Sequence, residues 1–191
     1  MKKQIYSLAF LLLLSFCVSA QTTDKTVEKI RTYYTDIAEK VRLCETDDDR
    51  GEFGELFMNE LAVNKRNHQW RAVGIHNFTY KFFYRGGDSE EHMYPDRLVM
   101  VKVERRESSR TYKEEYLYSD VGVLMFYFQK AENDDQAPAE RRVYFSGIKA
   151  IRITEDSKTR DKLSTKDAAT VKELTSQSAK IKDVFLRTLK F

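Results

Sequence analysis

Histidines and acidic clusters are the first places to look for chemistry in this 191-residue chain. The three histidines, His68, His76 and His92, are separated by eight and sixteen residues. Two histidines that bind one metal from a single element are spaced i, i+4 on a helix or i, i+2 on a strand. None of the three has such a partner. We therefore expect isolated histidines on the surface or at sheet edges, and no metal site.

A run of acids, Asp47–Asp49, stands just before Gly51 and makes this segment a candidate calcium loop. An EF-hand loop needs oxygen ligands at alternate positions and a glutamate at its twelfth residue. Counted from Asp47 the twelfth residue is Met58, and counted from Glu45 it is Leu56. Because the pattern is not met, we predict a solvated loop between a helix and a strand.

Catalysis by a side-chain nucleophile has no recognisable signature in this chain. A serine nucleophile commonly occupies a G-x-S-x-G turn, and the sequence, with only seven glycines, contains none. Acids suited to general acid–base chemistry do occur in strand-like segments: Glu104, Glu114 and Glu115. Arg105, Arg106 and Lys113 lie close by in the sequence, and cross-strand ion pairs explain these acids without catalysis.

Tyrosines in the strand-like segments are the side chains best suited to binding: Tyr80, Tyr84, Tyr112, Tyr116, Tyr118 and Tyr127. A tyrosine ring buries a large apolar area while its hydroxyl keeps a hydrogen bond. If both helices of the fold cover one face of the sheet, the opposite face exposes these rings to a small apolar ligand or an envelope protein. If instead the N-terminal helix covers that second face, the tyrosines belong to the core.

The strand-like segments lie between Trp70 and Thr154. Leu98–Glu104 and Val123–Phe128 are apolar at both odd and even positions, which is typical of strands covered on both faces. Phe78–Tyr84 alternates more regularly. The connections are short and rich in Gly, Ser and Asp, which favours hairpins, because parallel crossovers need a dozen residues or more. The sequence therefore predicts an antiparallel meander.

An amphipathic helix is predicted on each side of this block. The first spans residues 23–44 and carries apolar residues at spacings of three and four: Val27, Ile30, Tyr34, Ile37, Val41 and Cys44. The second is long and begins at a capping box made by Ser164 and Asp167. Phe53–Val63 is ambiguous, with a strand slightly favoured over a short helix. We predict an α+β fold, a single domain with a meander of about five to seven strands flanked by these helices.

Residues 1–20 have the features of a cleaved signal peptide. Lys2 and Lys3 precede the apolar run Ile5–Leu14, and Val18–Ala20 supplies small residues before the cleavage position. Cleavage between Ala20 and Gln21 leaves residues 21–191 as one domain. The apolar run is too short for a comfortable membrane span, so we expect none in the mature chain. Lipid attachment at Cys17 is the alternative.

Charge and cysteine content limit the remaining functions. Removal of Lys2 and Lys3 with the leader lowers the net charge from +3 to +1, which gives no electrostatic case for nucleic acid. Cys44 becomes a lone thiol without an internal disulfide partner. We predict an exported, periplasmic or secreted protein without a cofactor, acting as a non-enzymatic ligand- or protein-binding module of the bacterial-type cell envelope. The alternatives are a hydrolase with an unrecognised site, or an inhibitor or chaperone-like partner protein with an uncovered edge strand.

Overall fold

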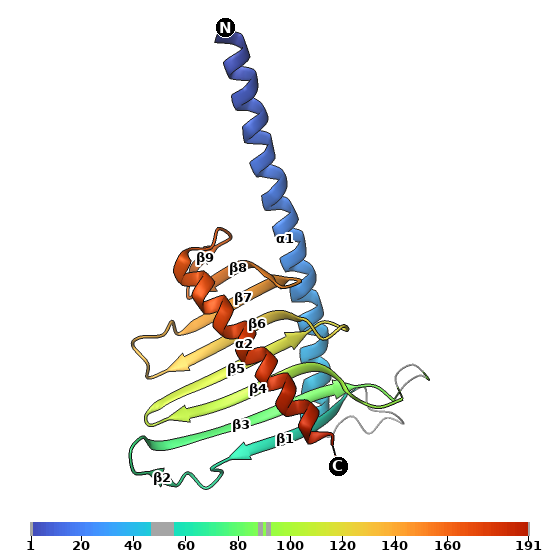
Figure 1. Cartoon of the computed structure of the whole chain (residues 1–191), viewed down its shortest axis with the longest axis vertical. Helices are drawn as coiled ribbons and strands as arrows, with labels where there is room; N and C mark the ends of the chain where they lie inside the picture. The colour runs from blue at the N-terminus through green and yellow to red at the C-terminus, as the bar shows by residue number, and fades with distance from the viewer. Residues whose placement is uncertain (1, 47–55, 88–89, 91–92, 191) are drawn as a thin grey trace.

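The structure, a computed structural model, describes residues 2–46, 56–87, 90 and 93–190, with side chains described from Thr22 onward. It confirms the predicted α+β architecture: an N-terminal helix, an antiparallel sheet and a C-terminal helix (Figure 1). The elements follow one another as α1 Lys2–Thr46, β1 Phe57–Val63, β2 Gln69–Trp70, β3 Gly74–Arg85, β4 Arg97–Glu107, β5 Arg110–Tyr118, β6 Leu124–Glu132, β7 Glu140–Ser146, β8 Lys149–Glu155, β9 Lys158–Arg160 and α2 Thr165–Thr188.

The described part of the chain forms one nine-stranded sheet in the order β1-β3-β4-β5-β6-β7-β8-β9, with β2 paired to β3. Every pair is antiparallel, as the short connections predict. The strand option for Phe53–Val63 is confirmed from Phe57 onward, where β1 begins. The strand number exceeds the predicted five to seven because β2 and β9 contain only two and three residues. Strands that short leave no periodic signal in a sequence.

α1 and α2 lie on opposite faces of the sheet, and both cross the strands (Figure 1). On one face, four residues of α1 pack against side chains from five strands: Phe83, Val99, Met100, Leu117, Phe126 and Tyr144. On the other face, α2 packs against alternate residues of the same strands: Phe82, Val101, Tyr116, Tyr127 and Val143. Leu98 to Val101 are all buried in β4, which explains the continuous apolar run there.

The α1 helix begins at Lys2, earlier than the predicted start at residue 23. Among α1 residues with described side chains, burial starts at Val27 and continues at Ile30, Ile37 and Val41. The described contacts of α1 with the core therefore all follow the predicted cleavage position between Ala20 and Gln21. Within the described residues, no helix is both long enough and apolar enough to cross a membrane.

Substitution of Phe185 tests whether the apolar stripe of α2 holds this helix to the sheet. Phe185 is fully buried, and its ring centroid lies 5.7 Å from that of Phe82 and 5.1 Å from that of Tyr84. We expect Phe185→Ala to lower the free energy of unfolding in urea by about 3–5 kcal/mol, because the site cannot collapse around the lost ring. Leu186→Ala is the matched control: Leu186 is 40 % exposed, and its loss should cost under about 1 kcal/mol. Equal losses at the two positions would contradict this placement of α2.

Candidate functional site

The six predicted binding tyrosines all lie on the α2 face of the sheet. Five are at most 7 % exposed and one, Tyr80, is half-buried at the edge of the core: the buried five are Tyr84, Tyr112, Tyr116, Tyr118 and Tyr127. The condition for exposing the whole set, two helices on one face, is not met, because α1 covers the opposite face (Figure 1). Tyr84, Tyr116, Tyr118 and Tyr127 therefore serve as core residues, and Tyr80 packs against the edge of that core. Tyr112 belongs to neither core cluster and lies beneath the guanidinium of Arg105.

The hydroxyls of these tyrosines remain protonated at neutral pH. Burial is the largest cause of a raised pKa in all six, and Glu114 raises the pKa of Tyr80, Tyr116 and Tyr127 further. A phenol in this state donates one hydrogen bond and is not a nucleophile. The tyrosines thus offer packing area and hydrogen bonds rather than reactivity.

A small cavity lies where α2 meets β3, β4 and β5, and we call it the α2 cavity. Its volume is about 230 Å³, and its lining includes Tyr80, Arg105, Glu114 and Tyr116. Glu114, 7 % exposed, accepts a hydrogen bond from Tyr116 Oη at 2.9 Å and pairs with Arg105 at 3.2 Å. The buried carboxylate is therefore matched by one cation and one phenol, which is the expected condition for a buried charge.

Next to this cavity, three aromatic side chains of β3 form a row that ends at the exposed Trp70 of β2; we call Trp70, His76, Phe78 and Tyr80 the aromatic strip. Successive ring centroids are 5.2, 5.9 and 5.4 Å apart, and Tyr80 stacks in turn on the buried Phe82 at 5.9 Å. Trp70 is 46 % exposed, and the other three are half-buried. The strip thus runs from the core beneath α2 to an open end of the sheet.

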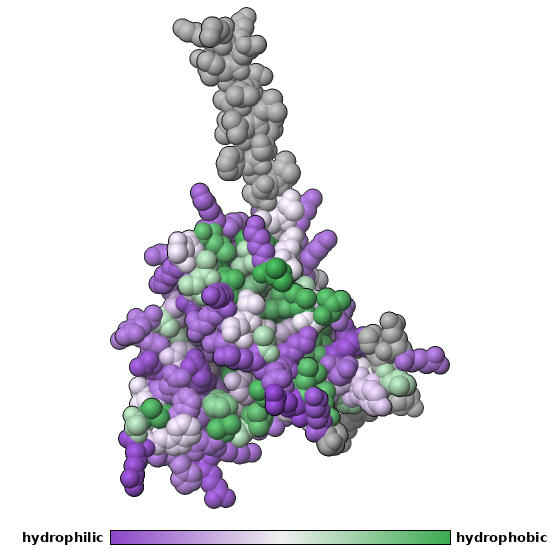
Figure 2. Space-filling model, viewed as in Figure 1, coloured by the Kyte–Doolittle hydropathy of each residue, from purple (hydrophilic) through white to green (hydrophobic). Residues whose placement is uncertain are grey.

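Aliphatic residues of β1 widen the aromatic strip into a patch. Leu61 lies directly opposite Tyr80 in the sheet, and Val63 lies opposite Phe78. Both are half-buried. Figure 2, which looks onto the α2 face, shows green and white atoms interrupting the purple surface over the lower strands. Tyr80 was predicted from the sequence as a site residue, whereas His76 and Phe78 were not, although all three share one parity within β3.

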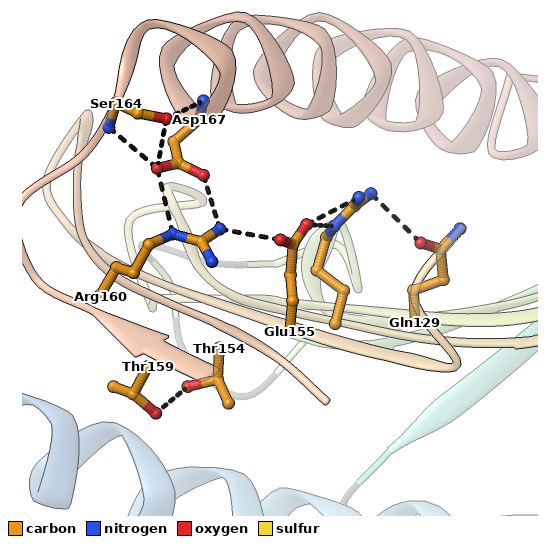
Figure 3. Close-up of polar contacts among 8 residues, drawn as sticks. Gln129, Thr154, Glu155, Thr159, Arg160, Ser164 and Asp167 are labelled. Atoms are coloured by element: carbon orange, nitrogen blue, oxygen red, sulfur yellow. Dashed lines mark hydrogen bonds and ion pairs between the residues drawn. The ribbon is translucent and has the colours of Figure 1, made fainter. Parts of the chain in front are cut away.

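Farther along the same face, a polar row joins the sheet to the start of α2 (Figure 3). Arg141 pairs with Glu155 at 2.9 Å, Arg160 bridges Glu155 and Asp167, and Asp167 accepts a hydrogen bond from the backbone N–H of Ser164 at 2.8 Å. Ser164 and Asp167 form the capping box predicted from the sequence. The hydrogen bonds of the whole polar row connect β7, β8, β9 and α2, and each carboxylate in the row has a guanidinium partner.

Among the described residues, the carboxylates with a shifted pKa are not suited to act as general acids. Arg160 is the main cause of the lowered pKa of Asp167. Burial raises the pKa of Glu155, but its hydrogen bonds from Arg160 and Arg141 lower it overall. Every carboxylate with a shifted pKa among the described residues is shifted downward. Such groups are ionised at neutral pH and cannot donate a proton to a leaving group.

The strand acids named in the sequence analysis do not converge either. All three border a cavity of about 290 Å³ beside α1. The carboxylate of Glu114, however, pairs with Arg105 on the α2 face, whereas that of Glu115 accepts a hydrogen bond from Tyr34 of α1. Glu45 of α1 borders that cavity and pairs with Lys81 at 2.9 Å and with Lys102 at 2.7 Å. Burial raises the pKa of Glu45, yet the two lysines lower it overall. The cavity is a surface network of matched charges.

The histidines and the cysteine that were considered as metal ligands or reactive groups do not form a common site among the described residues. His68 is exposed, His76 belongs to the aromatic strip, and His92 and Asp47–Asp49 lie outside the described residues. Across the described ranges, no group of three His, Cys, Asp or Glu side chains is arranged to hold a metal ion. Cys44 is half-buried, and its thiol donates to the Leu56 carbonyl oxygen at 3.5 Å. The thiol thus has a structural contact at the junction of α1 and β1.

Comparison with known proteins adds no functional assignment, because no family model, no curated protein and no solved structure matches this chain.

The polar row predicts an acid-sensitive contribution to stability. The folded-state pKa of Asp167 lies below its unfolded value of about 3.9, so its stabilisation is present above that pH and is lost as the pH falls. We expect Asp167→Asn to lower the free energy of unfolding by about 1–3 kcal/mol at pH 7. In urea titrations at decreasing pH, the difference from the unsubstituted protein should shrink below about pH 4.

Asp183→Asn is the control for this measurement. Asp183 is 62 % exposed and pairs with Arg187 within α2, so its loss should cost about 0.5 kcal/mol or less. A pH-independent loss at Asp167 would show that the substitution acts through packing rather than through charge.

Proposed function

We propose that this protein is an exported, non-enzymatic binding module of the bacterial-type cell envelope, and that a protein partner docks on the aromatic strip. The observation that carries the proposal is the strip itself, which leaves the core beneath α2 and remains half-exposed beside the edge strand β1. Contiguous exposed apolar surface with a polar surround is typical of recognition sites.

The chemistry of the strip supports a protein partner. Tryptophan and tyrosine are enriched among the residues that dominate binding energy at protein interfaces. Trp70 and Tyr80 supply these types, while Arg105 lies over the ring of Tyr112 with its guanidinium carbon 4.2 Å from the centroid. Arg105 also pairs with Glu107 at the border of the same area. The arrangement has an apolar centre and a charged border, as partner-binding surfaces do.

The shape of the site favours a protein over an enclosed small ligand. Small-molecule pockets commonly measure about 300–1,000 Å³, whereas the α2 cavity beside the strip measures about 230 Å³. A small apolar ligand is therefore the weaker of the two predicted partners for this face.

Export is supported by the leader and by the position of the core on α1. Residues 1–20 combine a basic start, an apolar run and small residues before Gln21. Because burial on the described part of α1 starts at Val27, cleavage before Gln21 removes no described core residue. The proposal therefore places a folded domain outside the cytosol.

Trp70→Ala tests the docking surface. We expect it to reduce recovery of the partner from solubilised envelope by about tenfold or more in quantitative mass spectrometry after cross-linking, since truncating such a residue typically costs 2 kcal/mol or more. The matched control is Ile148→Ala, because Ile148 is 90 % exposed but lies on the turn between β7 and β8. If both variants retain the same bound proteins as the unsubstituted chain, the strip is not the docking surface.

The edge strand supports a second candidate, an inhibitor or chaperone-like protein whose partner adds a strand to β1. Among the described residues, β1 pairs only with β3, and Phe57 and Met58 on it are 47 % and 40 % exposed. Unpaired edges accept extended peptides. Phe57→Lys places a charge on this edge. Loss of the partner with Phe57→Lys but not with Trp70→Ala would assign the partner to the edge instead of the strip.

The leader is tested by expressing the full chain in a bacterium and sequencing the N-terminus of the envelope fraction. We expect Gln21 as the first residue, and Ala20→Arg should block processing because the cleavage site requires small side chains. Cys17→Ser serves as the second variant. Failure of Cys17→Ser to be processed, with a lipid on the unsubstituted chain, would establish the lipid-anchored alternative.

A further inference from the structure

A second concave site lies on the opposite side of the molecule, between α1 and strands β6 to β9. We call this cavity of about 430 Å³ the α1 groove. Its helix wall is formed by Ile30, Arg31, Tyr34 and Thr35, and its sheet wall by Phe126, Arg142, Tyr144, Thr154 and Thr159. Its volume falls within the range of about 300–1,000 Å³ that is common for small-molecule sites.

The base of the α1 groove is aromatic. The Tyr34 and Phe126 ring centroids are 5.2 Å apart at an interplanar angle of 69°, and those of Phe126 and Tyr144 are 5.0 Å apart. Tyr144 and Phe126 are buried, and Ile30 beside them is 2 % exposed. The Tyr34 hydroxyl is already committed to Glu115 Oε2 at 2.5 Å, outside the lining. These contacts make a fixed apolar surface that can hold the body of a ligand.

The charge of the α1 groove is unbalanced, in contrast to the α2 cavity. Its lining contains Arg31 and Arg142 and no described carboxylate. Arg142 pairs with Glu140 at 2.7 Å, but Arg31 has no ion pair among the described residues. The Nε of Arg31 donates to Tyr144 Oη at 3.2 Å, which orients the guanidinium over the aromatic base. In the α2 cavity, by comparison, Arg105 is matched by Glu114.

Hydroxyls complete the polar part of the α1 groove. Thr154 Oγ1 and Thr159 Oγ1 lie 3.1 Å apart, across the β8–β9 pair. A hydroxyl can donate to an anion and accept from a neighbour, so this pair can add a hydrogen bond to a bound oxyanion. Guanidinium groups recognise carboxylate and phosphate through paired N–H donors.

We propose that the α1 groove binds an amphipathic anion, with its carboxylate or phosphate head at Arg31 and Arg142 and its apolar body against Phe126 and Tyr144. The unmatched charge of Arg31 selects for an anionic head. The aromatic base selects against a purely hydrophilic ion such as inorganic phosphate. This site is independent of the aromatic strip, because α1 and α2 cover opposite faces of the sheet (Figure 1).

Isothermal titration calorimetry on the purified protein tests the proposal with three probes of equal chain length: decanoate, decyl phosphate and decanol. We expect at least one of the two anions, at concentrations below its micellar limit, to bind about tenfold or more tightly than decanol. The anion with the lower Kd identifies the preferred head group. Inorganic phosphate alone should give no measurable heat.

Arg31→Gln should weaken binding of the preferred anion by about tenfold or more and leave decanol unchanged, because a hydrogen bond to a charged group contributes about 1.5–3 kcal/mol. Lys149→Gln is the matched control, since it removes the same charge from an exposed position at the start of β8. Thr159→Phe fills the groove from an exposed position and should abolish binding of all three probes while leaving the urea midpoint unchanged.

Three results would overturn the proposal: no heat from either anion, equal affinity for decanol and both anions, or equal effects of Arg31→Gln and Lys149→Gln. Because Arg31 and Thr159 are exposed, their variants are expected to fold, and the urea midpoint measured alongside verifies this.

Discussion

The width of a helix relative to the length of a strand is the constraint that shapes this molecule. The central strands β3 to β6 contain nine to twelve residues, which corresponds to about 30–40 Å. A helix is only about 10–12 Å across with its side chains. One helix crossing each face therefore covers a band of the sheet and leaves the remainder of every long strand open. Both candidate sites lie at the borders of these bands.

The two open areas differ in chemistry, although they are opposite sides of the same strands. Beside α1, the open face carries charged residues such as Lys81, Lys102, Glu104 and Lys113, which is how a solvated sheet face ordinarily looks. Beside α2, the open face carries the aromatic strip. Hydration does not favour aromatic rings at such a position, because polar side chains would interact with water more favourably there. The contrast between the two faces is the physical basis for the proposal that a partner binds on the α2 side.

Local periodicity was enough to predict the strands and both helices. The short connections predicted the antiparallel order, and the spacing of Ser164 and Asp167 predicted the capping box. None of these signals could predict which face each helix covers, because that depends on long-range packing. The burial of Tyr116 and Tyr118 and the exposure of Trp70 follow from that choice. The α1 groove could not be predicted from the sequence either, because Arg31 and Arg142 line the same cavity only after the sheet has formed. Likewise, Gln129, Arg141 and Glu155 become neighbours only through the register of three strands.

The two chain ends lie at opposite edges of the sheet. Asp24, which follows the predicted cleavage position, pairs with Arg152 of β8 at 2.8 Å, whereas Thr188 at the end of α2 accepts a hydrogen bond from Asn59 of β1. The aromatic strip lies at the β1 side (Figure 1). A molecule immobilised through its N-terminus, on a sensor chip or by a lipid, would therefore present the strip outward. Attachment through the C-terminus would hold that surface against the support.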